Sequence, residues 1–293
     1  MNRRVALRGI ASAASLGLFA RPRGLLAQMA DVPYVPTPWV VVEAMLNIAR
    51  VTQGDYVVDL GCGDGRLVIT AAKKYGAAGF GVDIDGKLVS EAQREARRQG
   101  VEGRAAFYER NLFITDFSKA TVMTMYLTTK INLQLRPRLF EVLKPGARVV
   151  SHDFDMGNWR EDERLKVAVP DKPYGPPSSE IYLWIVPANA AGLWEWRAQG
   201  GTPGAFDLAL EQTFQMLTGK GAAGVTVEGG RGRGDAIRLT LIAPAGGRAV
   251  RHEFEGRIAG DTITGRMRTG DGADAAWSAT RSKRGSIALP LAE

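Results

Sequence analysis

The stretch Tyr56-Val57-Val58-Asp59-Leu60-Gly61-Cys62-Gly63-Asp64-Gly65-Arg66 decides the fold of the first half of the chain. Its opening residues form a short apolar run that predicts a buried strand, and a helical pattern begins at Leu67. A glycine turn between a strand and a helix lets a ligand approach the backbone at the helix N-terminus. This stretch therefore predicts a ligand-binding strand–turn–helix unit.

Strand and helix patterns alternate on both sides of this unit. Helices are expected from Pro38 to about residue 49 and over 67–75, 88–99 and 131–143. Strands are expected over 56–60, 79–82, 105–108, 121–127 and 148–154, with a closing hairpin over 167–169 and 181–186. Such alternation predicts an α/β domain, in which helices cover both faces of a largely parallel, Rossmann-like sheet.

After Pro187 the apolar residues alternate with period two, as in the run 206–216. Glycine-rich turns, among them Gly229-Gly230, are expected to separate short strands, so this part predicts an all-β barrel or sandwich. We divide the chain into a leader at 1–29, an α/β domain at 30–189 and a β domain at 190–293. Packing roles are expected for four tryptophans: Trp159, Trp184, Trp194 and Trp196. Arg231 and Arg233 are expected in a solvated turn, with anion binding as the alternative.

Composition excludes several classes of protein. The 293 residues are 45% hydrophobic, which excludes whole-chain disorder. A single cysteine and two histidines argue against disulfides and against a metal site. No apolar run reaches the ~20 residues of a membrane-spanning helix. The formal charge of +7 is concentrated in five arginines of the first 28 residues, so we expect no nucleic acid partner.

The leader combines Arg3-Arg4, a weakly apolar stretch and small residues near Ala27. A basic start followed by such a stretch is typical of an export signal, and the paired arginines resemble a twin-arginine signal. We therefore expect a periplasmic or exported protein. The alternative is a cytoplasmic protein with a basic tail.

The spacing of the glycines indicates which kind of ligand the loop binds. A dinucleotide fingerprint needs a third glycine where this chain has Arg66. The observed pattern is acid-x-G-x-G-x-G, and Asp59 suits a cationic ligand without a pyrophosphate, such as S-adenosylmethionine (SAM). Candidate binding residues are Asp59, Gly61, Gly63 and Gly65, with Asp83 for the ribose hydroxyls, Ile84 against the adenine, and Asn111 with Leu112 or Phe113 at the adenine. The alternative roles are a helix cap for Asp59 and turn residues for Asp83 and Asn111.

Two candidate catalytic residues lie where later strands end. Tyr126 lies at the end of the fourth strand, where it either borders the transferred methyl group or packs in the core. His152, beside Asp153, either orders a substrate, accepts a proton, or is a satisfied polar group at a strand end. Cys62 is expected to be a small filler in the loop, and Asp64 and Asp85 to be turn and cap residues.

Four stretches carry a resemblance to a known family: Tyr34–Pro38, Asp59–Arg66, Asn111–Phe113 with Asp116-Phe117, and Leu143–Ser151. Residues 33–186 resemble a class I SAM-dependent methyltransferase, and within it the protein-lysine methyltransferases related to the enzyme that acts on the c subunit of ATP synthase. The resemblance implies a seven-stranded sheet, with Thr37 and the glycine loop near the methionine end of SAM. The family usually has Asp where Asn111 stands.

The resemblance implies methyl transfer from SAM to a lysine amine on a protein. Two alternatives stay open. One is a methyltransferase for a small molecule, lipid or quinone, with the β domain shaping the pocket. The other is a non-catalytic SAM-binding protein whose β domain binds a partner.

Overall fold

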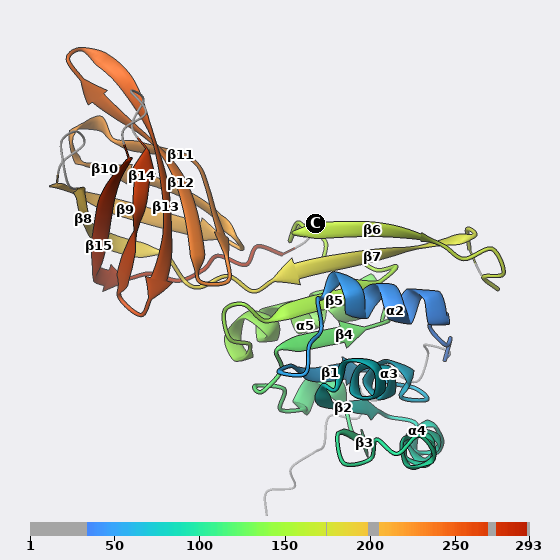
Figure 1. Cartoon of the computed structure of the whole chain (residues 1–293). Helices are drawn as coiled ribbons and strands as arrows, with labels where there is room; N and C mark the ends of the chain where they lie inside the picture. The colour runs from blue at the N-terminus through green and yellow to red at the C-terminus, as the bar shows by residue number, and fades with distance from the viewer. Residues whose placement is uncertain (1–33, 174, 199–204, 269–273, 292–293) are drawn as a thin grey trace, which may run out of the picture. The chain divides into compact units, whose positions relative to one another are not determined.

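The computed structural model describes residues 34–173, 175–198, 205–268 and 274–291. The leader predicted at 1–29 lies outside these residues, so export stays a prediction. Figure 1 shows that the first half of the described chain forms an open sheet with helices and the second half a barrel. Over the described residues, no helix has the length and apolar character needed to cross a membrane.

The sheet has seven strands in the order β3-β2-β1-β4-β5-β7-β6. Strands β1 to β5 pair in parallel, whereas β7 pairs antiparallel with both β5 and β6. This confirms the parallel sheet with an edge hairpin. The strands are β1 (Tyr56–Leu60), β2 (Ala78–Asp83), β3 (Ala105–Glu109), β4 (Val122–Met125), β5 (Arg148–His152), β6 (Glu163–Ala168) and β7 (Ser178–Ile185).

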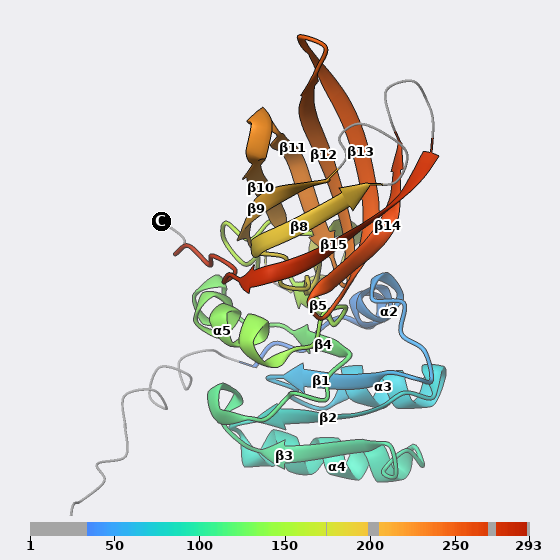
Figure 2. The ribbon, with the colours of Figure 1, turned by 90° about the vertical axis from the view of Figure 1, so that its left-hand side faces the viewer.

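Helices cover both faces of this sheet. Figure 2 shows α5 in front of the sheet and α3 and α4 behind it. Local signals set the helix ends: Gly76 adopts a left-handed conformation where α3 stops, and Asp85 accepts the Lys87 N–H at the start of α4. The helices are α2 (Trp39–Ile48), α3 (Arg66–Tyr75), α4 (Gly86–Arg98) and α5 (Thr129–Val142), with a 3₁₀ turn η1 at Leu112–Ile114.

The second half is a closed barrel in the order β10-β11-β12-β13-β14-β15-β8-β9, which settles the choice between barrel and sandwich. Its apolar residues point inward at period two, and Trp196 stacks on Trp277 with ring centroids 4.1 Å apart. The strands are β8 (Gly192–Ala198), β9 (Ala205–Thr213), β10 (Met216–Gly221), β11 (Thr226–Arg233), β12 (Ala236–Ala245), β13 (Arg248–Ala259), β14 (Thr262–Arg268) and β15 (Asp274–Arg284), with a 3₁₀ turn η2 at Ala222–Gly224. The four tryptophans expected to pack are all buried.

Two expectations for the β domain are wrong. The run 206–216 is not one strand, because Phe214 has a φ of 51° and makes the turn between β9 and β10. Gly229-Gly230 lies inside β11, where the pairing register shifts as in a β-bulge. Arg231 and Arg233 are therefore strand residues, and their partly exposed side chains pair with the carboxylates of Asp162 and Glu163.

Those pairs belong to a seam between the barrel and the sheet. The Arg231 guanidinium donates to Asp162 Oδ1 at 2.7 Å, and Gln215 Nε2 donates to the Arg160 carbonyl at 2.6 Å. Phe214 stacks near Trp159, with ring centroids 6.2 Å apart. The boundary near residue 189 falls between the end of β7 and the start of β8, and it stays a proposal.

Candidate functional site

The glycine loop between β1 and α3 is held against β2. The N–H groups of Gly61 and Cys62 donate to the Val82 carbonyl at 2.9 and 3.0 Å. The Gly63 N–H donates to Asp83 Oδ2 at 2.9 Å. These amides are used inside the protein, so a ligand at this edge meets a rigid backbone surface rather than these donors.

Glycine is required in this loop by conformation and by space. Gly61 and Gly65 have φ values of 80° and 79°, in the left-handed region. A Cβ at Gly65 would lie 2.6 Å from the Phe107 ring, and one at Gly61 would lie 2.9 Å from Leu127. The alternate glycines therefore let the loop pass closely over its neighbours.

Asp83 stands at the end of β2 and fixes two backbone amides. Its Oδ2 accepts from Gly63, and its Oδ1 accepts from the Asp85 N–H at 3.0 Å. Ile84, next in the chain, is half-buried. Contact of Asp83 with a ribose and of Ile84 with an adenine stays a prediction, but the structure places both beside the loop.

Asp59 lies beneath the loop and is almost fully buried. Thr124 Oγ1 on the neighbouring strand β4 donates to Asp59 Oδ1 at 2.7 Å. Burial raises the pKa of Asp59 to about 7; the Thr124 hydrogen bond lowers it, and the carboxylates of Asp83 and Asp64 raise it. Asp59 is therefore about half ionised at neutral pH, and a cationic ligand nearby would favour its ionised form.

Asn111 begins the η1 turn, and its Oδ1 accepts the Phe113 N–H at 2.8 Å. Leu112 is buried, whereas Phe113 is half-buried, so Phe113 is the more accessible of the two. The Arg138 guanidinium, on α5, donates to the Phe113 and Thr115 carbonyls at 2.7 Å each. Arg138 was not predicted to lie here, because nothing in the local sequence pattern links α5 to this turn.

Thr37 lies just before α2 and is buried. Its carbonyl accepts from Arg66 Nη1 at 2.6 Å, and this arginine also pairs with Asp64 in the glycine loop. Arg66 thereby ties the segment before α2 to the loop. Thr37 and the loop, which the resemblance places together, are indeed joined in the structure.

Tyr126 and His152 meet at the ends of β4 and β5. Their ring centroids are 3.8 Å apart at an interplanar angle of 32°. His152 is fully buried, and burial lowers its pKa to about 4, although Asp153 raises it and Lys172 lowers it further. The imidazole is therefore neutral at neutral pH. Burial, with a contribution from Asp153, also raises the pKa of Tyr126.

Both nitrogens of His152 face protein oxygens. Nδ1 is 3.4 Å from Thr37 Oγ1, and Nε2 is 2.8 Å from Ser179 Oγ. Nε2 is also 3.4 Å from Asp153 Oδ2. This geometry brings the predicted residues Thr37, Tyr126 and His152 into one cluster.

The structure supports the modest roles expected for the remaining loop residues. Cys62 is buried, and burial raises the pKa of its thiol well above the usual value, so it is a poor nucleophile. Asp64 accepts the Arg66 N–H at 3.2 Å, as a turn residue just before α3, whose N-cap is Gly65. Among the described residues, no group of three His, Cys, Asp or Glu side chains could hold a metal ion.

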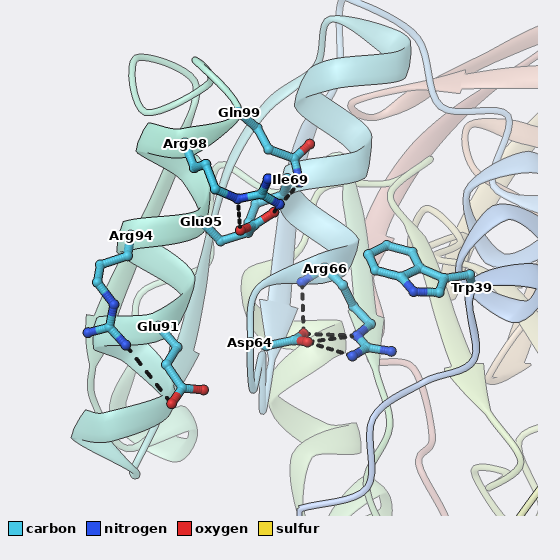
Figure 3. Close-up of a pocket in the computed structure, with 9 residues that line it drawn as sticks. All are labelled: Trp39, Asp64, Arg66, Ile69, Glu91, Arg94, Glu95, Arg98 and Gln99. Carbon is cyan, nitrogen blue, oxygen red and sulfur yellow. Dashed lines mark hydrogen bonds and ion pairs between the residues drawn. The ribbon is translucent and has the colours of Figure 1, made fainter.

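A pocket of about 490 Å³ lies between α3 and α4. Figure 3 shows its lining, which consists of Trp39, Ile69 and several charged side chains. Those side chains pair with one another: Arg66 with Asp64, Arg94 with Glu91 and Arg98 with Glu95. Arg66 also lies 4.9 Å from the centre of the Trp39 ring. This pocket offers no cluster of unbalanced charge, so the carboxylates at the sheet edge define the better candidate site.

Comparisons with known proteins identify methyltransferases as relatives of the first half of the chain. A model of the ANTKMT methyltransferase domain matches residues 59–163. A protein-lysine N-methyltransferase from Saccharolobus islandicus is 44% identical over 162 residues, which cover 55% of this chain and 98% of that protein. The human lysine N-methyltransferase named for the c subunit of ATP synthase is 34% identical over 131 residues, 45% of this chain and 55% of that protein.

Among solved structures, one titled an RNA methyltransferase from Salinibacter ruber, in complex with S-adenosyl-L-homocysteine (SAH), is 45% identical. It matches 52% of this chain and 93% of that chain, with a TM-score of 0.47. The matched residues 59–163 end before the barrel begins at Gly192. The 44% identity over nearly the whole Saccharolobus relative is enough to assign the first half of this chain to the same family. The chain belongs to the family of SAM-dependent methyltransferases that includes the Saccharolobus islandicus enzyme.

Proposed function

We propose that this methyltransferase modifies the side-chain amine of lysine in a protein substrate. The observation that carries the proposal is the 44% identity to a protein-lysine N-methyltransferase across 98% of that relative. The human relative, a lysine N-methyltransferase by its name, supports the same acceptor, although this chain spans only about half of its length.

The acidic residues around the glycine loop fit SAM. Asp59, Asp64 and Asp83 are close enough for the last two to raise the pKa of the first. Asp64 is paired with Arg66, so the carboxylates of Asp59 and Asp83 are the ones that attract a sulfonium and an ammonium group and would repel the pyrophosphate of a dinucleotide. We place the methionine end of SAM near Asp59 and Thr37, the ribose at Asp83, and the adenine between Ile84 and the η1 turn at Asn111.

When bound, SAM supplies a methyl group on a sulfonium that leaves readily. The protein then has to position a neutral amine in line with that methyl group. A lysine with its ordinary pKa near ~10.4 is charged at neutral pH, so the site must favour the neutral form. In our proposal, the half-buried Tyr126 borders the amine and helps to exclude water, and the proton leaves to solvent.

The test supplies methyl-labelled SAM with a protein extract, an RNA extract and a small-molecule extract, and locates the label by mass spectrometry. Label on lysine side chains supports the proposal. Label only in RNA or only in small molecules would contradict it and name the acceptor class. SAM binding without any turnover would favour the non-catalytic alternative.

A pair of aspartates at the end of β2 tests the cofactor placement. Asp83→Ala removes the acceptor proposed for the ribose and should weaken SAM binding by about 1–3 kcal/mol. Asp85→Ala, two residues on, removes only the cap of α4 and serves as the matched control. Calorimetry should show weaker binding for the first variant and unchanged binding for the second. Equal affinities for the two variants would remove Asp83 from the site.

A further inference from the structure

His152 is poorly placed to accept a proton from a substrate. It is fully buried, and the ring of Tyr126 lies 3.8 Å from its own. Each of its ring nitrogens already faces a hydroxyl group, Thr37 on one side and Ser179 on the other. A buried imidazole with both nitrogens facing protein oxygens is suited to orienting its neighbours.

The surroundings of Nε2 select one tautomer. This nitrogen lies 2.8 Å from Ser179 Oγ and 3.4 Å from a carboxylate oxygen of Asp153. A carboxylate attracts an N–H and repels a bare nitrogen lone pair, so the single proton of the neutral ring belongs on Nε2. Nδ1 is then an acceptor, and the Thr37 hydroxyl 3.4 Å away must donate to it.

Asp153 is itself held firmly. Its Oδ2 accepts from Lys172 Nζ at 2.5 Å, and its Oδ1 accepts from the Glu180 N–H at 2.9 Å. The Asp153 backbone has a φ of 59°, an uncommon conformation for a residue other than glycine. A residue kept in such a conformation by several contacts is a pre-organised one.

We propose that Asp153 and His152 are positioning residues that fix the Thr37 hydroxyl as a hydrogen-bond acceptor for the ammonium group of SAM. Asp153 holds the proton on Nε2, Nδ1 receives the Thr37 hydroxyl hydrogen, and the lone pairs of Thr37 Oγ1 turn toward the ligand. Tyr126 keeps the imidazole plane in place. The inference rests on the proposed placement of SAM at Thr37, and it is independent of the acceptor.

The tautomer can be read directly, because the chain contains only two histidines. His252 lies buried in the barrel and serves as an internal reference. In ¹⁵N-histidine-labelled protein, NMR should show His152 protonated at Nε2 and bare at Nδ1. Addition of SAH, which carries the same ammonium group, should shift the His152 signals and leave those of His252 in place. Protonation at Nδ1 in the complex would overturn the proposal.

Coupling between Asp153 and Thr37 separates positioning from a merely structural role. Asp153→Asn should weaken SAH binding about tenfold, the value of one hydrogen bond to a charged group. In a Thr37→Val background, Asp153→Asn should cause no further loss, because its effect passes through the Thr37 hydroxyl. Thr37→Ser, which keeps the hydroxyl, should retain affinity.

Asp155→Asn is the matched control, since Asp155 is exposed and caps only a local turn at Gly157. Its SAH affinity should equal that of the unmodified chain. An unchanged His252 signal in every variant verifies that the barrel is intact, and an unchanged far-UV circular dichroism spectrum and melting temperature verify the fold of the sheet. An equal loss from Asp153→Asn with and without the Thr37 hydroxyl would overturn the proposal. Failure of the lysine assignment would leave these measurements unaffected, because they need no methyl acceptor.

Discussion

The sheet edge and the barrel use buried polar groups in opposite ways. In the barrel, the Arg281 guanidinium donates to the carbonyls of Ala191, Asn189 and Gly260, and Gln212 likewise bonds to backbone groups. At the sheet edge, the buried Asp59 accepts from the Thr124 hydroxyl, and the nearby carboxylates of Asp83 and Asp64 raise its pKa. Polar groups bonded to backbone stabilise a fold, whereas like charges held together store electrostatic energy that a cationic ligand can release.

The largest effect is expected when the two regions are separated. The fragment 30–189 should fold and bind SAM, since its sheet, helices and glycine loop are complete without the barrel. It should be less stable than the whole chain, because the contacts of Phe214 and Gln215 with residues 159–160 are lost. Circular dichroism and SAM calorimetry provide the measurements. A fragment insoluble under conditions where the whole chain is soluble would show that the regions share one core.

Two glycines, one in each region, compare packing constraints. Gly65 and Gly246 both have positive φ, but a Cβ would contact Phe107 at 2.6 Å in the first case and nothing within 4 Å in the second. Gly65→Ala should cost ~2–4 kcal/mol of unfolding free energy and abolish SAM binding. Gly246→Ala should cost only ~1 kcal/mol and spare binding. Urea unfolding measures both, and similar losses at the two positions would contradict the tight loop.

The pH dependence of SAM binding tests Asp59. A carboxyl with a pKa near 7 must ionise to attract a cation, so affinity should rise with pH through 7. Between pH 7 and 6 we expect about a fivefold loss, since the ionised fraction falls by that factor. His152, with a pKa near 4, stays neutral across this range. Asp59→Asn should flatten the profile, and a persisting slope would assign the ionisation to another group.

The smallest expected effect concerns the ion pairs of two barrel arginines, Arg231 and Arg238. Arg231 pairs with Asp162, whose side chain is 2% exposed, whereas Arg238 and Glu255 are 78% and 66% exposed. Arg231→Ala should cost ~0.5–1 kcal/mol, and Arg238→Ala should have no measurable effect on thermal unfolding. Equal melting temperatures for the two variants would contradict a seam stabilised by Arg231.

The strands and helices of the sheet region could be predicted because their signals lie in residues close together in the sequence. The strand at 56–60, the glycine loop and the acid ending β2 all follow from local patterns, and the cluster of Tyr126 with His152 follows from parallel strands ending at one edge. Contacts between distant segments were not predictable. No local pattern joins Lys172 to Asp153 or Arg138 to the η1 turn, because neither pair has a helical or strand spacing.

The β domain was less predictable for a different reason. Alternation at period two marks strands but does not say where one ends, so the turn at Phe214 was hidden inside an apolar run. Gly229-Gly230 resembles a turn, yet it lies at a register shift inside β11. A Cβ at Gly230 would lie 2.6 Å from Leu217 on the adjacent strand, so the glycine there is required by space across the strands. Such crowding depends on pairing across strands, which a single strand's sequence does not encode.

The most direct test of the account is a crystal structure with SAH bound. The account predicts the ligand at the sheet edge, with its ribose at Asp83, its ammonium group near Thr37 and Asp59, and its adenine at the turn beginning with Asn111. Ligand found instead in the pocket between α3 and α4 beside Trp39, or inside the barrel, would contradict the assignment of the carboxylates at the sheet edge as the cofactor site.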